Sequence, residues 1–186
     1  MGWTILLVVV VLLVLYFITA YNGLVNLRNM VKDQWAQVDV LLKRRADLIP
    51  NLVETVKGYA AHEKDTLEAV INARNKAVSA TTSDEEMKAN GELTGALNRL
   101  FALAESYPEL KANTNFIDLQ NNLKEAEDKI SYARQFYNDA VLKYKNKLEM
   151  FPSNIVASMF GFKPEAFFEV SEKDKEVPQV KFYAYL

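Results

Sequence analysis

The first twenty residues form an almost unbroken apolar run. Every residue from 3 to 20 is apolar or weakly polar, and the first charged side chain is Arg28. An 18-residue helix is about 27 Å long, close to the ~30 Å hydrocarbon core of a bilayer. Trp3 and Tyr21 place amphipathic rings near its two ends, where headgroups lie. We therefore predict a transmembrane anchor over residues 1–22.

A cleaved signal peptide is the alternative interpretation of this run. Such a peptide needs a positive charge before a shorter apolar core and small residues at the cleavage site. Residues 1–3 carry no charged side chain, and Ile18 occupies the outer small-residue position. Residues 22–45 carry five basic and two acidic side chains. By the positive-inside rule, the soluble domain is expected in the cytoplasm and the short N-terminus outside.

The pattern after the anchor is helical. Residues 24–107 hold three glycines, one proline and no alternating β-branched run, so strands are not expected. Alternating steps of four and three from Leu24 to Tyr59 give eleven positions, of which nine are apolar. Such a stripe needs a partner helix. Pro50 interrupts it, and we predict a turn over residues 46–51; the unbroken stripe supports a kink as the alternative.

Three further helices complete the predicted domain. The second runs to about Ala80, and Ser83 with Glu86 forms a capping-box pattern that starts the third, which closes at Pro108. The last, over residues 116–151, is apolar at ten of eleven three-four positions. Segments of roughly 24, 30, 24 and 36 residues have comparable lengths. We therefore predict an all-α protein, with the transmembrane helix followed by an antiparallel up-down four-helix bundle over residues 23–151.

The C-terminal region has a different character. Residues 152–170 form a dense apolar segment without helical regularity, and its aromatic candidates for an interaction are Phe160, Phe162, Phe167 and Phe168. After four helices this segment returns to the membrane end, where it would dock on lipid beside Lys143, Lys145 and Lys147. The alternative is that the aromatic rings cap the open end of the bundle core. Residues 171–186 are predicted to be a short extended tail.

The amino-acid composition argues against several classes of protein and of catalytic or metal site. The 22 basic and 24 acidic residues argue against a nucleic-acid-binding chain. Without cysteine there is no disulfide, cysteine-rich zinc module or thiol catalysis, and no cysteine to carry a lipid. His62 is the single histidine, and Thr66 stands where a zinc-hydrolase motif needs a second one. We expect no catalytic residues, no cofactor, no metal site, no nucleic-acid partner and no enzyme activity.

Charge patterning adds two interaction candidates. Lys43, Arg44 and Arg45 form a basic cluster that would bind an acidic partner or a lipid headgroup, unless it is only a solvated rim. Residues 82–130 carry ten acidic and five basic side chains, whereas residues 131–148 carry one acidic and four basic ones. This separation would favour packing between protomers, although pairing within one bundle explains it equally well.

Several motifs resemble one family. They are YNGLV at 21–25, QWAQVDV at 34–40, KRRADLIPNLVETVKGY at 43–59, YPELKAN at 107–113, ARQFYN at 133–138 and FPSN at 151–154. These stretches are spread over residues 21–154, and in them the sequence resembles the LemA family. The resemblance extends over nearly the whole chain. The resemblance implies a bacterial single-pass membrane protein with a helical bundle on the cytoplasmic side. It implies no activity, because the family has no established catalytic residues.

Three hypotheses follow. The first is a non-enzymatic scaffold of the bacterial inner membrane that self-associates or recruits a protein partner. The second is a lipid-binding or membrane-remodelling protein that inserts its C-terminal aromatic side chains. The third is a metal-dependent enzyme whose site is shared between protomers, with one histidine from each chain.

Overall fold

The computed structural model describes residues 1–168, and this part of the chain is all-α with no strand. Its helices are α1 (Gly2–Lys57), α2 (Lys64–Ser79), α3 (Ser83–Ala104), α4 (Pro108–Lys111), α5 (Thr114–Glu149) and α6 (Ser153–Met159). The predicted all-α class with a long apolar N-terminal helix is confirmed. The predicted tail over residues 171–186 lies outside the described residues, as do the last two residues of the predicted apolar segment.

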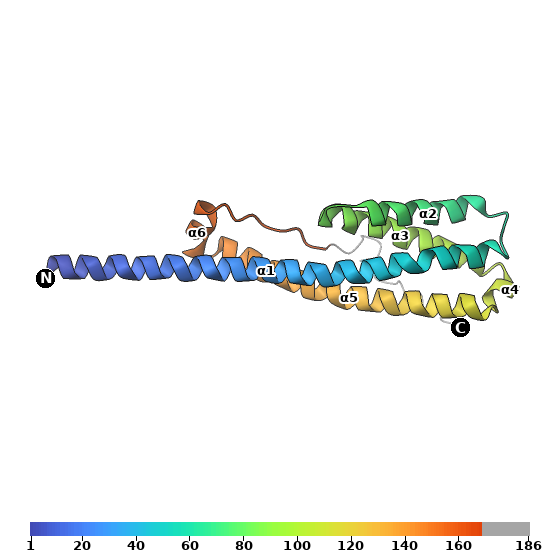
Figure 1. The fold of residues 1–186 in the computed structure, drawn as a ribbon, viewed down its shortest axis with the longest axis horizontal. Helices are drawn as coiled ribbons and strands as arrows, with labels where there is room; N and C mark the ends of the chain where they lie inside the picture. The colour runs from blue at the N-terminus through green and yellow to red at the C-terminus, as the bar shows by residue number, and fades with distance from the viewer. Residues whose placement is uncertain (169–186) are drawn as a thin grey trace, which may run out of the picture.

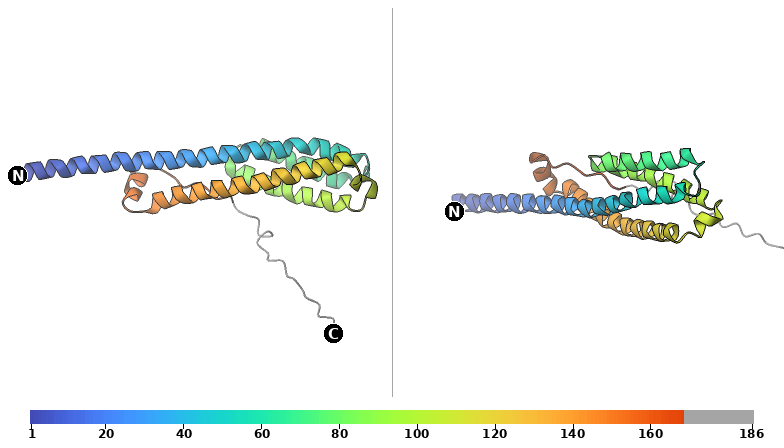
Figure 2. Two further views of the ribbon diagram at one scale, coloured as in Figure 1. Left: turned by 90° about the horizontal axis from the view of Figure 1, so that it is seen from below. Right: turned by 45° about the vertical axis from the view of Figure 1, so that its right-hand side comes forward.

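The described part of the molecule is a rod built along α1 (Figure 1). With 56 residues, α1 is about 84 Å long. Its N-terminal part projects alone, whereas α5 lies beside its C-terminal part and the pair α2 and α3 covers only the far end (Figures 1 and 2). The chain passes from α5 through α6 back onto α1. We call the end near α6 proximal and the end near α4 distal.

Pro50 lies inside α1, so the predicted turn over residues 46–51 is wrong. A helical proline leaves the carbonyl four residues earlier without its usual N–H donor. That carbonyl belongs to Ala46, and the Arg74 side chain on α2 donates to it through Nε at 3.4 Å. Leu42, Ile49 and Val56 are buried on both sides of the proline. The apolar stripe and a tertiary hydrogen bond therefore keep the helix continuous.

The helix lengths and one cap also differ from expectation. The chain reverses after Lys57, so α2 has 16 residues instead of about thirty. The capping box of α3 is formed by Thr82 and Glu85, one residue before the predicted pair. Glu85 also accepts hydrogen bonds from the backbone and hydroxyl of Thr81. These bonds, led by the one from the Thr81 backbone, lower the pKa of Glu85.

The C-terminal segment contains a helix that its composition did not reveal. The seven-residue α6 buries Val156 and Ala157 against α1 and α5. Ser153 is also buried, and its hydroxyl donates to the carbonyls of Lys147 (2.7 Å) and Met150 (2.8 Å) at the end of α5. Contacts with α1 and α5 therefore stabilise this short helix, whose own sequence shows no helical period.

Two hydrophobic clusters follow one another along the rod. The distal core joins α1 from Ile49 onward to α2, α3, α4 and the start of α5. The proximal core joins α1 from Ala20 to Leu42 with α5 from Ile130 onward, α6 and the chain after it. Because α2 and α3 are short, only Met87 from this pair packs against the proximal core.

Candidate functional site

The chain after α6 makes a turn at residues 160 and 161 and then continues without regular secondary structure to residue 168. We call residues 160–168 the aromatic strap. It covers part of the proximal core, against which only Met87 of α2 and α3 packs. Phe168 is buried, and its backbone exchanges two hydrogen bonds with the Asn138 side chain, at 2.8 and 3.0 Å. The Phe168 ring lies 6.1 Å from Trp35, and the Arg134 guanidinium lies 4.3 Å above it. These contacts hold the end of the strap in a defined position against α1 and α5.

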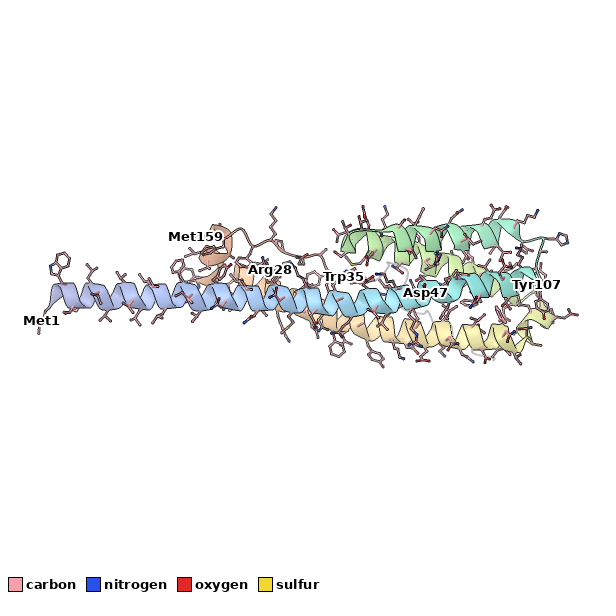
Figure 3. The ribbon with its side chains drawn as sticks, in the orientation of Figure 1. Met1, Arg28, Trp35, Asp47, Tyr107 and Met159 are labelled. Carbon is pink, nitrogen blue, oxygen red and sulfur yellow. The ribbon has the colours of Figure 1, made fainter. Side chains whose placement is uncertain are left out.

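The other aromatic residues of the strap follow the helix pair towards the proximal end. Phe160 and Phe162 lie 4.8 and 5.7 Å from the ring of Tyr21. The Arg28 guanidinium lies 5.1 Å above Phe162, and the Lys145 ammonium lies 5.8 Å from the centre of Phe167. Figure 3 shows Met159 beside the projecting part of α1 and Tyr107 at the opposite end of the rod. The four predicted aromatic residues therefore gather on the proximal half.

Tyr137 connects the strap to α5. Its hydroxyl donates to the Ala166 carbonyl at 2.8 Å, and its ring lies 5.2 Å from Trp35. Burial, together with the negative charges of Glu165 and Asp84, raises the pKa of Tyr137 to about 12. The phenol therefore stays neutral and serves as a structural hydrogen-bond donor.

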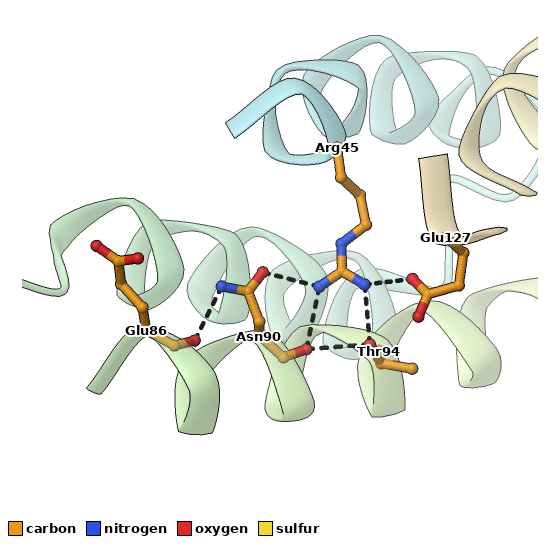
Figure 4. A network of polar contacts seen from close by, with 5 residues as sticks. All are labelled: Arg45, Glu86, Asn90, Thr94 and Glu127. Carbon is orange, nitrogen blue, oxygen red and sulfur yellow. Dashed lines mark hydrogen bonds and ion pairs between the residues drawn. The ribbon is translucent and has the colours of Figure 1, made fainter. Parts of the chain in front are cut away.

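The predicted basic cluster is divided by the fold. Arg45 is only 2% exposed and points between α3 and α5 (Figure 4). Its guanidinium donates to Glu127 (2.5 Å), Thr94 (3.0 Å) and Asn90, whose side-chain oxygen lies at 2.8 Å. Arg45 therefore belongs to the interior, and only Lys43 and Arg44 remain at the surface. Binding of an acidic partner by these two residues stays a prediction.

Lys43 already has a neighbour of opposite charge. Its ammonium lies 3.2 Å from the Asp39 carboxylate, one turn earlier on α1. Glu86 of α3 faces both residues and has one buried carboxylate oxygen without a hydrogen-bond partner. Burial and the negative charge of Asp39 raise the pKa of Glu86, and Lys43 partly offsets them.

Sequence reasoning missed an exposed aromatic pair. Tyr132 and Phe136 lie one helical turn apart on α5 and are 67% and 62% exposed. They point away from the face that buries Ile130 and Tyr137. Two contacts show how α1 and α5 are aligned: Arg45 contacts Glu127, and Trp35 contacts Tyr137. Residue numbers rise along α1 while they fall along α5 between these contacts. Five residues after Trp35 on α1 therefore lie level with five residues before Tyr137 on α5. The exposed Val40 is therefore level with Tyr132. The signal was present in the sequence as two aromatic residues outside the apolar stripe.

Comparison with known proteins settles the family. The chain matches the LemA family profile over residues 34–182, which is most of its length. The chain belongs to the LemA family. The match includes the buried Arg45 network and the aromatic strap of this LemA family member.

Named relatives are similar over most of their length. The magnetosome proteins MamQ 1 and MamQ 2 of Paramagnetospirillum magneticum are each 27% identical, covering 88% of this chain and 71% of the relative. Protein LemA of Metamycoplasma hominis is 27% identical, covering 83% of this chain and 71% of the relative. Magnetosome protein MamQ of Magnetospirillum gryphiswaldense is 24% identical, with 88% and 71% covered.

The N-terminal helix of this LemA family member is long and apolar enough to cross a membrane. α1 contains a segment with a mean hydropathy of 2.8, of which only 6% is buried within the described chain. A core helix of a soluble protein is mostly buried, so this segment is not explained by packing inside the domain. Within residues 1–168, no group of three or more His, Asp or Glu side chains is arranged to hold a metal ion.

Proposed function

We propose that this LemA family protein is a non-enzymatic scaffold, anchored by one helix in the bacterial inner membrane. The anchor holds an up-and-down helical bundle on the cytoplasmic side, with the short N-terminus outside. The bundle binds a second copy of the chain through the outward face of α5. The positive flank after the apolar run supports this orientation.

The exposed pair Tyr132 and Phe136 carries the proposal of self-association. Large aromatic residues dominate the energetics of protein interfaces, and exposed apolar patches often mark interaction sites. The basic Lys129 and Lys143 and the acidic Glu125 and Asp139 border the pair on α5. Lys129 already pairs with Glu125 on the same helix. Such a mixed polar rim suits a face that meets a copy of itself, because it carries no excess of one charge.

Disulfide crosslinking in membranes tests this face. The chain has no cysteine, so Phe136→Cys introduces a unique thiol in the full-length protein. We expect this variant to form disulfide-linked dimers on mild oxidation in vesicles. Val78→Cys on α2 is the control, because Val78 is also an exposed apolar residue but lies on another face.

Equal crosslinking of both variants would show random collision and would count against the interface. Light scattering in mild detergent gives a second, independent result. We expect the native chain to be oligomeric and Tyr132→Ser with Phe136→Ser to shift it towards the monomer. A monomeric native chain without a co-purifying protein would contradict the scaffold proposal.

A further inference from the structure

Five large apolar side chains are exposed from the end of α5 to the first residue of the aromatic strap. We call them the apolar collar: Met150, Phe151, Ile155, Met159 and Phe160. Phe151 is 79% exposed and Met159 is 63% exposed. No charged residue occurs between Glu149 and Lys163. Because α6 buries Val156 and Ala157 on its inner face, it is apolar on both sides. No part of the described chain covers its outer side.

The collar lies at the level where the apolar run of α1 ends. Phe160 stacks edgewise on Tyr21, the residue after that run. Phe162, two residues further along the strap, lies under Arg28, the first charged residue of the chain. When the apolar run fills the hydrocarbon core of a bilayer, this transition from apolar to charged residues marks the headgroup boundary. The collar is therefore held at that boundary.

Basic side chains flank the collar in the sequence. Lys143, Lys145 and Lys147 lie on the last turns of α5, and Lys163 follows the collar in the chain. The Lys147 side chain reaches α1, where its Cε lies 4.0 Å from the position a Cβ would take at Gly23. Cations at this depth attract the anionic headgroups of bacterial lipids. Apolar insertion and charge attraction thus act on the same surface.

We propose that the apolar collar is a second membrane contact, which lies in the interface of the leaflet from which α1 emerges. A short helix with exposed apolar side chains and flanking lysines has the chemistry of an interfacial element. Continuity with the membrane span favours lipid as the occupant of this face. The proposal depends on α1 spanning the membrane and not on self-association through α5.

Spin-label accessibility in vesicles tests the proposal on the full-length chain. Single nitroxides are attached at Met159→Cys and Phe151→Cys in a bilayer of zwitterionic and anionic phospholipids. Each label is exposed in turn to oxygen, which concentrates in lipid, and to a water-soluble nickel chelate. Leu12→Cys in the span and Val78→Cys on α2 are the lipid and water references, and circular dichroism checks that each variant is helical.

We expect the ratio of oxygen to nickel accessibility at both collar sites to exceed that at Val78→Cys several-fold and to approach that at Leu12→Cys. A ratio equal to that at Val78→Cys would overturn the proposal. Shielding from both reagents that disappears when the protein is diluted in lipid would also overturn it, because a second copy would then cover the collar. Loss of crosslinking at Phe136→Cys alone would leave this result unaffected.

Discussion

At the scale of single residues, Arg45 has the most unusual environment. Its side chain lies between Leu42 of the proximal core and Ile49 of the distal core. Its partner Glu127 lies between Leu123 and Ile130 on α5, at the same junction. A buried charge is costly unless it is paired and hydrogen-bonded. The network therefore fixes the register of α1 against α3 and α5 where the two cores meet.

Replacing Glu127 tests how much its ion pair with Arg45 stabilises the fold. Glu127→Ala leaves the buried guanidinium without its counter-charge, and we expect a loss of about 2 kcal/mol in the free energy of unfolding. This value is below the usual range for buried pairs because the Glu127 side chain is 44% exposed. Adding Arg45→Met should recover most of the loss, since no charge is then buried. Chemical unfolding in mild detergent measures both. An unchanged stability of Glu127→Ala would contradict this account.

The raised pKa of Glu86 predicts that the free energy of unfolding depends on pH. Because its pKa is raised in the fold, the native state binds a proton more readily than the unfolded state. Its contribution is therefore fully present below the usual pKa of 4.5 and is lost as pH rises through the raised value. Glu86→Gln should gain stability relative to the native chain between pH 4 and pH 7, by less than about 1 kcal/mol because solvent screens the half-buried carboxylate.

Thermal unfolding of both proteins across this pH range measures the difference. Glu68→Gln, on an exposed part of α2, controls for the loss of one negative charge. A stability difference between Glu86→Gln and the native chain that is constant with pH would show that Glu86 does not titrate as proposed.

At the scale of elements, the continuity of α1 depends on a contact distant in sequence. Arg74 supplies the donor that Pro50 lacks. We expect Arg74→Ala to cost about 1 kcal/mol in the native chain and less in the Pro50→Ala variant, which restores the helical donor. Asn75→Ala is the control, because Asn75 also contacts the Arg74 side chain. Additive effects in this double-mutant cycle would show that the two residues are not coupled.

The aromatic strap depends on Asn138 in a similar way. Asn138→Ala removes two hydrogen bonds to Phe168, each worth about 1 kcal/mol. Hydrogen exchange at the Phe168 amide should become at least about five-fold faster. Asn138→Asp keeps the acceptor and should show a smaller change. Unchanged exchange in Asn138→Ala would mean that aromatic packing alone holds the strap.

These elements show what the sequence could predict. The period of the apolar positions correctly indicated long helices, and the helical continuity of residues 24–57 was visible in the stripe itself. The turn at Pro50 was wrong because the donor for Ala46 comes from α2, which no local pattern reveals. For α6, a seven-residue helix is too short to show a period. The burial of Arg45 was equally hidden, since its partners lie 45 or more residues away.

At the scale of the whole molecule, the fold places the end of the apolar N-terminal run and the apolar collar together. The distal turn after α1 and the return of α5 bring α6 back beside the projecting helix (Figure 2). From residue 22 to residue 57, α1 rises about 50 Å. In the proposed arrangement, the rod carries its distal core and the single histidine far from the membrane, whereas the apolar collar and the lysines lie beside it.

The central claim is that the C-terminal segment returns to the membrane end of the rod. Spin labels at Asn22→Cys and Ser158→Cys in the full-length chain measure this distance directly. We predict a short separation, because Tyr21 and Phe160 are in ring contact. The pair Asn22→Cys and His62→Cys should give about 50 Å or more, the length of α1 from residue 22 to its C-terminal end. A separation between residues 22 and 158 as long as this reference would place α6 at the distal end and contradict the account.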